Sequence, residues 1–238
     1  YHQEQKFSDF EKATAIGRMA AQIAHEVNNP LEVIKNSLYL LQNSLNQQDH
    51  QTTKFLEVAR KETERVSNII KQMLVFPAKI NTSDTKYVDV NRILEEIVVL
   101  VEKTLKQHQI DIKLHLFNNL PTVFISEDKL KQVILNLVLN SKEAMQAGGI
   151  LSLSTALQSD NIFGTTSVVI EVSDTGRGIE PDHLKDIFEP FVSFKKERGT
   201  GLGLWICQAI IHTYGGKIEV KSSLGKGSSF AVIIPLSI

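Results

Sequence analysis

The feature that most constrains the fold is a long, nearly unbroken helical pattern: between Phe7 and Met73 there is one glycine, Gly17, and one proline, Pro30. Apolar residues recur there at intervals of three and four, which is typical of one face of an α-helix: Ile16, Met19, Ala20, Ile23, Val27, Leu31, Ile34, Leu38, Leu41 and Leu45. A polar segment at 43–53 precedes a second apolar stripe: Phe55, Leu56, Ala59, Val66, Ile69, Ile70, Met73 and Leu74. These patterns predict an antiparallel helical hairpin. Its core is too small to stand alone, so we expect a second copy to complete a four-helix bundle, as a homodimer.

The pattern changes near residue 80, where Pro77 and the polar residues 81–85 indicate a linker. Beyond it the sequence predicts helices at 91–107, 126–146, 182–188 and 202–214, and strands at 110–117, 150–157, 167–173, 217–222 and 229–236. Either Asp89 or Asn91 can cap the first of these helices, and Ser126 can open the second. Helices interleaved with hairpin-linked strands favour a two-layer sandwich, so we expect an α+β protein with domains at 1–79 and 80–238.

Composition excludes several classes of protein. The 26 Lys and Arg residues nearly balance the 27 Asp and Glu residues of the 238-residue chain, so no net field favours nucleic acid or a membrane surface. No apolar stretch approaches the ~20 residues needed to cross a bilayer, so we expect no direct membrane insertion. The single cysteine, Cys207, forms no intramolecular disulfide, which favours the cytoplasm. The chain begins at Tyr1 without an initiator methionine, and we expect an upstream sensor, with any membrane anchor, outside this sequence.

A histidine with nucleophilic potential lies in the first predicted helix. His25 is followed at once by Glu26, whose carboxylate could hold the imidazole tautomer and accept the ring proton. Pro30 removes a backbone hydrogen bond one turn later, a cost of about 3 kcal/mol that favours a bend point. The alternative is that His25 is an ordinary surface or core histidine with no chemical role. A zinc-protease helix does not fit, because Asn29 stands where the second histidine ligand belongs.

Two glycine-containing segments are candidates for nucleotide binding. Asp174-Thr175-Gly176-Arg177-Gly178 follows a predicted strand, where a carboxylate can accept a hydrogen bond from an exocyclic amine; a plain turn is the alternative. Gly199-Thr200-Gly201-Leu202-Gly203 leads into an apolar helix, whose first amides attract phosphate. The second segment lacks both the Gly-Lys-Ser/Thr ending of a P-loop and the spacing of a dinucleotide site.

Two asparagines and a basic segment complete the set of candidates. Asn136 and Asn140 are four residues apart and therefore lie on one helix face, where an amide oxygen is a suitable Mg²⁺ ligand. Buried asparagines that cap a neighbouring loop are the alternative. The segment 187–198 begins aromatic and ends basic, as a lid over ATP would.

In this order, these residues resemble the sensor histidine kinases of two-component signalling. The similarity runs from residue 13 to 236 through the family's motifs: the H box (His25 to Leu31), N box (Asn136 to Asn140), G1 box (Asp174 to Gly178), F box (Phe188 to Phe191), G2 box (Gly199 to Gly203) and the glycine-rich entry to the last strand (Gly225 to Phe230). The H box and the lid Phe191-Val192-Ser193-Phe194-Lys195 look most like kinases of the nitrogen-regulation type. Val192-Ser193-Phe194 replaces the threonine-rich lid of many relatives.

The resemblance implies a dimeric phosphotransfer hairpin followed by an ATP-binding domain of the Bergerat type. It implies His25 as phosphoacceptor, Glu26 as its acid/base partner, and Asn29 as the residue that aligns water when a response regulator is dephosphorylated. It places Asn140 on Mg²⁺ with Asn136 beside it, and Asp174 on the adenine amine. The remaining ATP-site residues that it implies are Gly176, Gly178, Phe191, Lys195, Gly199, Thr200, Gly201, Leu202, Gly203 and Ser228.

Autophosphorylation of His25 by ATP, then transfer to an aspartate of a response regulator, is the function that this resemblance implies. Two other classes stay open. One is an ATPase or chaperone-like clamp of the same fold, but such ATPases carry a water-activating glutamate where Asn136 stands. The other is a phosphatase or scaffold that binds nucleotide without efficient kinase activity.

Overall fold

The computed structural model describes residues 27, 29–41, 54–63, 66, 84–146, 148–160, 165–190, 192 and 201–236. The chain divides near residue 78 into two compact units, and each is described by itself. No helix in these described stretches combines the length and the apolar content needed to span a bilayer.

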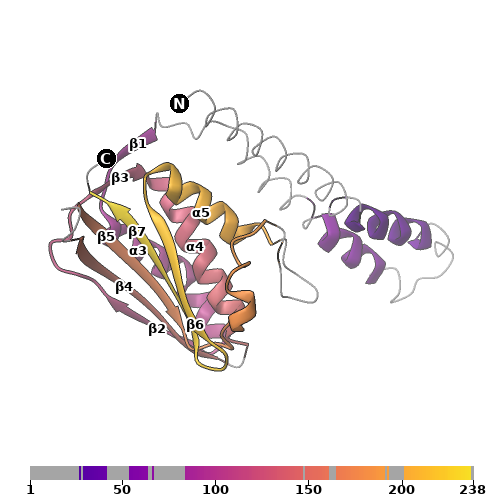
Figure 1. The fold of residues 1–238 in the computed structure, drawn as a ribbon. Coiled ribbons are helices and arrows are strands. Elements are labelled where there is room, and N and C mark those ends of the chain that lie inside the picture. The colour runs from indigo at the N-terminus through magenta and orange to yellow at the C-terminus, as the bar shows by residue number, and fades with distance from the viewer. Residues whose placement is uncertain are drawn as a thin grey trace. The chain divides into compact units, whose positions relative to one another are not determined.

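The N-terminal unit contributes helical residues 29–41 and 54–63, drawn in indigo and purple in Figure 1. Both fall inside the two predicted helices; the predicted turn at 43–53 lies outside the described residues. Six large apolar side chains on these helices are more than 40% exposed: Leu31, Val33, Leu38, Tyr39, Leu40 and Leu56. A single copy of this unit therefore leaves much apolar surface exposed to water.

The second unit is built on a five-stranded sheet of order β2-β4-β5-β7-β6. Its strands are β2 (Ile110–His115), β4 (Gly149–Asp160), β5 (Thr165–Asp174), β6 (Lys217–Ser223) and β7 (Gly227–Pro235). Only the β2–β4 pair is parallel. The helices α3 (Val90–Gln107), α4 (Glu127–Ala144) and α5 (Gly203–Thr213) cover one face of the sheet (Figure 1). The expected two-layer α+β architecture is confirmed.

Alternation along the strands explains why one face is covered. On β5, Val168, Ile170 and Val172 are fully buried, whereas Glu171 between them is exposed. The same period places Leu151 and Leu153 of β4 in the core. Because each strand is apolar on one side only, the sheet has one apolar face, and one layer of helices buries it. Each helix packs its own apolar stripe against that face.

Helix starts agree with the capping signals in part. The Asp89 carboxylate, and not Asn91, accepts the hydrogen bond from the Arg92 amide (3.2 Å) and caps α3. Ser126 is the N-cap residue of α4, but its hydroxyl makes no capping bond. Glu127 and Asp128 in the first turn of α4 suit the positive end of the helix dipole instead.

One prediction of secondary structure was wrong, and two strands were missed. The helix expected at 182–188 is a short 3-10 helix, Pro181–His183, followed by turns with hydrogen bonds over three residues, such as Asp186 N–H to the His183 carbonyl (3.0 Å). Without an apolar repeat, so short a segment does not stabilise a full α-helix. Strands β1 (Thr85–Val88) and β3 (Val123–Ser126) were not expected; they pair with each other as an antiparallel two-stranded sheet. Each has only four residues, too few for a clear alternation.

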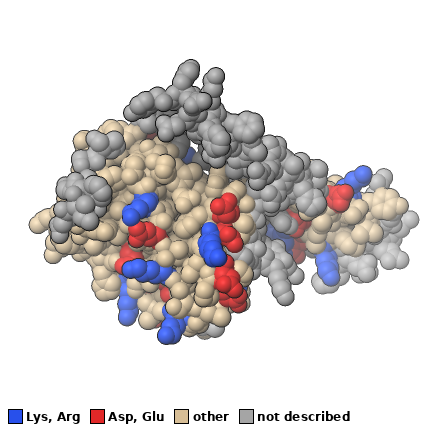
Figure 2. Space-filling model, in the orientation of Figure 1, with Lys and Arg blue, Asp and Glu red and all other residues tan. Residues whose placement is uncertain are grey.

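An ion-pair network joins β1, α3 and α4. Glu127 pairs with Lys131 (2.8 Å), Lys86 (2.8 Å) and Arg92 (3.0 Å), and its side chain is only 16% exposed. Lys131 and Lys86 hydrogen-bond the carboxylate, and these bonds lower the pKa of Glu127 to about 2. On the face seen in Figure 2, basic and acidic side chains likewise lie beside one another over the described residues.

We expect Glu127→Gln to destabilise the protein by about 1 kcal/mol at pH 7, because screening by solvent reduces what so large a pKa shift implies. A lowered folded-state pKa contributes stability above the ordinary pKa of glutamate, and that contribution disappears as pH falls from about 4.5 toward 2. Urea unfolding at pH 7 and pH 4, with and without 1 M NaCl, measures it. Glu95→Gln, an exposed glutamate of α3, is the matched control. An equal loss of stability in both variants would contradict the network's role.

Candidate nucleotide-binding site

A buried carboxyl group at the end of β5 is the centre of the site. Asp174 is 5% exposed, and its Oδ1 atom accepts hydrogen bonds from the amides of Gly176 (2.8 Å) and Ser228 (3.3 Å). Burial raises the pKa of Asp174, and the bonds from Gly176 and Ser228 offset part of that rise. Within the described part of the chain no hydrogen bond reaches Oδ2. One oxygen therefore fixes the carboxyl plane while the other stays available to a ligand.

The turn after Asp174 is held on two sides. The Arg177 amide donates to the Ala144 carbonyl at the end of α4 (3.1 Å), and the Gly225 amide donates to the Arg177 carbonyl (2.7 Å). Gly178 has φ +70°, and a Cβ atom there would overlap the Ser223 carbonyl oxygen. A side chain at 178 would both strain the backbone and push this turn away from β6. The turn predicted after Asp174 is present in the structure, and its backbone hydrogen bonds connect it to α4 and to the turn between β6 and β7.

The hydroxyl groups of Ser228 and Ser222 connect the start of β7 with β6. Ser228, 6% exposed, lies 3.0 Å (Oγ to Oγ) from Ser222, which also donates to the Gly227 carbonyl (2.9 Å). The Ser222 hydroxyl in turn accepts from the Ile179 amide (2.8 Å). This network ties β6, β7 and the Gly178 turn together beneath the Asp174 carboxyl. The sequence analysis identified Ser228 but not Ser222.

Both predicted asparagines lie half-buried on α4. The Asn136 amide donates to the Cys207 sulfur on α5 (3.2 Å), and a Cβ atom on Gly203 would stand 2.7 Å from Asn136 Nδ2. Gly203 therefore allows the first turn of α5 to lie against Asn136. Cys207 is fully buried, and burial raises the pKa of its thiol to about 12, so it is a structural residue without nucleophilic reactivity.

The glycine-rich segment ends at a helix start, as predicted. Gly201 has φ +66°, Leu202 is the N-cap residue, and α5 begins at Gly203. The first amides of an α-helix have no partner within the helix and carry the positive end of its dipole, so this terminus favours an anion. Gly199 and Thr200 lie outside the described residues.

The structure thus brings Asp174, Gly176 and Ser228 into direct contact and places Asn136 against the Gly203 terminus. Asn29 is an exposed residue of the N-terminal helix. The predicted site residues that lie outside the described residues are His25, Glu26, Phe191, Lys195, Gly199 and Thr200.

One buried polar residue of α4 was not predicted from the sequence. Ser141, on α4, is 2% exposed, and its hydroxyl has no hydrogen-bond partner of ordinary geometry in the described chain. Burial raises the pKa of Asp174, and Ser141 offsets part of that rise. A signal was present: Ser141 is the polar member of an otherwise apolar buried stripe, formed by Leu130, Val133, Ile134, Leu137 and Val138.

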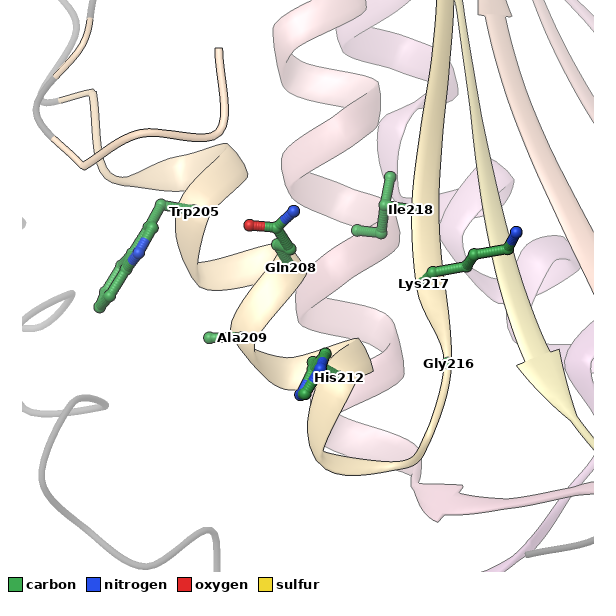
Figure 3. A pocket seen from close by; sticks show the side chains of 7 residues that line it. All are labelled: Trp205, Gln208, Ala209, His212, Gly216, Lys217 and Ile218. Atoms are coloured by element: carbon green, nitrogen blue, oxygen red, sulfur yellow. The ribbon is translucent and has the colours of Figure 1, made fainter. Parts of the chain in front are cut away.

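A pocket of about 360 Å³ lies elsewhere, between α5 and the start of β6 (Figure 3). Its lining residues are Trp205, Gln208, Ala209, His212, Gly216, Lys217 and Ile218. Trp205 projects from α5 away from the strand in this view. The pocket contains none of the residues predicted to bind a nucleotide.

Magnesium was expected at Asn140. Among the described residues no cluster of three or more His, Cys, Asp or Glu side chains could hold a metal ion by itself. Asn140 is half-buried, one turn from Asn136 and on the helix that packs against α5. One amide oxygen on this helix is a suitable ligand for Mg²⁺, which binds through few protein groups together with phosphate oxygens and water.

Two family models match the chain. Residues 15–79 match the His Kinase A (phospho-acceptor) domain, and residues 125–238 match the histidine kinase-, DNA gyrase B- and HSP90-like ATPase. Together they match part of each unit and contain every site residue that was predicted from the sequence.

Two relatives of the chain are named as histidine kinases. The chain is 33% identical over 234 residues to the signal transduction histidine-protein kinase AtoS of Escherichia coli K12, covering 98% of this chain and 37% of that protein. It is 35% identical over 230 residues to the sensor histidine kinase ZraS of Salmonella typhimurium, covering 95% of this chain and 47% of that protein. The chain thus spans less than half the length of these relatives.

Solved structures lead to the same family. The catalytic domain of histidine kinase ThkA superposes with a TM-score of 0.56 at 31% identity, covering 64% of this chain and 97% of that one. Histidine kinase ThkA in complex with response regulator protein TrrA superposes with a TM-score of 0.77 at 25% identity, covering all of this chain and 66% of that one. With the phosphoacceptor-domain model matching one unit and the histidine kinase-type ATPase model matching the other, the chain belongs to the sensor histidine kinases.

Proposed function

We propose that this chain is the catalytic core of a sensor histidine kinase, which transfers the γ-phosphoryl group of ATP to His25 and then to an aspartate of a response regulator. The observation that carries the proposal is the buried Asp174 carboxyl, held through one oxygen and open at the other, in the same unit as a glycine-rich helix start. The domains that we propose are 1–79 for dimerisation and phosphotransfer and 80–238 for ATP binding.

In the ATP site, Oδ2 of Asp174 accepts a hydrogen bond from the adenine amine, while the amides of Gly176 and Ser228 keep the carboxyl in place and Gly178 allows the turn after it to lie against β6. The amides of residues 199–203 receive the phosphates, and Phe191 and Lys195 belong to the lid. Bound through Asn140 with Asn136 beside it, Mg²⁺ would neutralise phosphate charge, which is the main requirement of phosphoryl transfer.

In the transfer step, the neutral imidazole of His25 attacks the γ-phosphorus of ATP. A nitrogen–phosphorus bond forms, the bond from phosphorus to the β,γ-bridging oxygen breaks, and ADP leaves. Glu26 accepts the remaining ring proton and so prevents a positively charged product. When a phosphorylated response regulator is dephosphorylated, Asn29 aligns the attacking water molecule. Its exposed position in the N-terminal helix is compatible with that role.

The exposed apolar side chains of the N-terminal helices support a homodimer. Leu38 and Tyr39 are 52% and 64% exposed in the single chain, and among the described residues of this unit the buried hydrophobic core consists of Ala59 and Val66. A second copy of the hairpin would bury this surface in a four-helix bundle. We also propose an upstream sensor domain and a cytoplasmic location, for which the reduced, buried Cys207 is favourable.

A water-activating ATPase is the competing function, and Asn136 is the observation against it. The Asn136 side chain donates its amide hydrogen to Cys207, and an amide does not act as a general base. We therefore expect hydrolysis of ATP without a phosphoprotein to be slow.

The test is incubation of the purified chain with Mg²⁺ and γ-labelled ATP. We expect the protein to become labelled, with a label that is lost in acid and stable in base, as a phosphorus–nitrogen bond requires. Release of free phosphate without labelled protein would support the ATPase instead. ATP binding without turnover would favour a phosphatase or scaffold.

A further inference from the structure

Ser222, near the end of β6, makes three polar contacts through one hydroxyl group. It accepts a hydrogen bond from the Ile179 amide (2.8 Å), donates one to the Gly227 carbonyl (2.9 Å) and lies 3.0 Å from the Ser228 hydroxyl oxygen. A hydroxyl has one proton and two lone pairs, so with its proton on the Gly227 carbonyl it accepts from both other groups. The protein thus uses the whole hydrogen-bonding capacity of this side chain, and none is left for a ligand.

The register of the sheet relates Ser222 to the Asp174 carboxyl. Asp174 of β5 is opposite Ser228 of β7, and Ser228 is opposite Ser222 of β6. The three residues form one row across three neighbouring strands, of which β6 is the edge strand. Ser222 is therefore two strands away from the carboxyl and acts on it only through the groups that lie between them.

The two amides that hold the Asp174 carboxyl come from separate segments of the chain. Gly176 belongs to the turn after β5, whereas Ser228 lies at the start of β7. Both amides donate to the same carboxyl oxygen, Oδ1. The orientation of the carboxyl therefore depends on the spacing between these two segments.

Ser222 is hydrogen-bonded to both segments. The bond from the Ile179 amide holds the chain directly after the turn, and the contacts with Gly227 and Ser228 hold the start of β7. Without the Ser222 hydroxyl, the Ile179 amide and the buried Ser228 hydroxyl both lose their acceptor. The turn and the strand would then be held together less tightly, and the carboxyl between them would be less well oriented.

We propose that Ser222 is a positioning residue for nucleotide binding, which sets the spacing of the two amides that orient the Asp174 carboxyl. The proposal rests on the proposed ATP-binding function. It adds a residue of the edge strand that contributes to affinity without contacting the nucleotide, because it acts through Gly176 and Ser228.

The experiment compares ATP with purine riboside triphosphate, which lacks the N6 amine, on the wild-type chain and on Ser222→Ala. Dissociation constants are measured by calorimetry below the melting temperature of each protein. We expect the variant to bind ATP about 5-fold more weakly, the usual effect of one hydrogen bond. It should bind the analogue as the wild type does, because without the amine the orientation of Asp174 no longer affects binding.

Autophosphorylation kinetics distinguish positioning from a general loss of structure. We expect Ser222→Ala to raise the KM for ATP by the same factor and to leave kcat unchanged, because contacts to the base are equal in the bound substrate and in the transition state. A general defect of folding would instead reduce the active fraction, and hence kcat, at an unchanged KM.

Matched variants separate the hydroxyl from side-chain volume. Ser223→Ala changes the next residue of β6, which is exposed, and should leave both affinities unchanged. Ser222→Thr keeps the hydroxyl, Ser222→Val has the same shape without it, and both residues suit a strand. The threonine variant should bind ATP like the wild type and the valine variant like Ser222→Ala. This pair carries the test if Ser222→Ala does not fold.

The outcomes separate the two proposals. Equal ATP affinity in wild type and Ser222→Ala, an equal loss for ATP and the analogue, or equal ATP affinity in the threonine and valine variants overturns the role of Ser222 while ATP binding stands. Wild type that binds neither nucleotide overturns the proposed function, and this inference with it.

Discussion

Replacing His25 with glutamine is expected to abolish incorporation of phosphate from γ-labelled ATP while leaving ATP affinity unchanged. Glutamine keeps polarity and approximate size, but its amide nitrogen shares its lone pair with the carbonyl and does not attack phosphorus. The nucleotide contacts come from Asp174, Gly176 and Ser228, in the other unit of the chain. The measurement combines labelling with a separate titration of ATP.

The matched control for this variant is His212→Gln, because His212 is an exposed histidine of α5 outside the proposed site. It should label like the wild type. Acid-labile label that persists in His25→Gln would refute His25 as the phosphoacceptor. Loss of ATP binding in that variant would mean that residue 25 affects the nucleotide site itself.

Replacing Asp174 with asparagine is the second change with a large expected effect, a loss of ATP affinity of about 100-fold. The substitution is nearly isosteric. Its amide oxygen can still accept from Gly176 and Ser228, so its NH₂ group then faces the ligand in place of Oδ2. An amide donor would meet the adenine amine donor, and the hydrogen bond becomes a repulsive contact. Equal ATP affinity in the variant would contradict the assignment of the base site.

The same variant should have the opposite effect on the stability of the ligand-free protein. Burial raises the pKa of Asp174, so the folded protein binds its proton more tightly than the unfolded chain does. Stability is then lost as pH rises from the ordinary pKa of aspartate through the raised value. Asparagine has no charge to desolvate, so we expect Asp174→Asn to melt at a higher temperature than wild type at pH 7. This difference should vanish at pH values below the ordinary pKa.

That melting measurement also controls the binding result. A variant that has gained stability has kept its fold, so its weaker ATP binding arises in the site. A lower melting temperature at pH 7 would instead indicate that the carboxylate is needed to hold Gly176 and Ser228 in place.

The local sequence was sufficient to predict most of the helices and strands of the second unit. Capping signals predicted α3 and α4, alternation predicted β2, and the sequence also predicted β4, β5, β6 and β7 to within a few residues. Asp174 and the helix start at Gly203 were recognised because a carboxylate after a strand and glycines before an apolar helix have meaning without any partner. The four-residue strands β1 and β3 were missed because their pairing involves segments almost 40 residues apart in the chain.

Contacts between distant segments were decided by the tertiary structure alone. The sequence placed Asn136 beside Asn140, but only the packing of α4 on α5 joins its amide to the Cys207 sulfur, 71 residues away. In the same way Ser141 was one more helix residue in the sequence, and only the fold shows that it is buried. The sequence by itself determined which groups could do chemistry, because their types and local spacing are written in it. Which of those groups meet, and which buried group lacks a partner, depends on burial and long-range packing, and these exist only once the chain is folded.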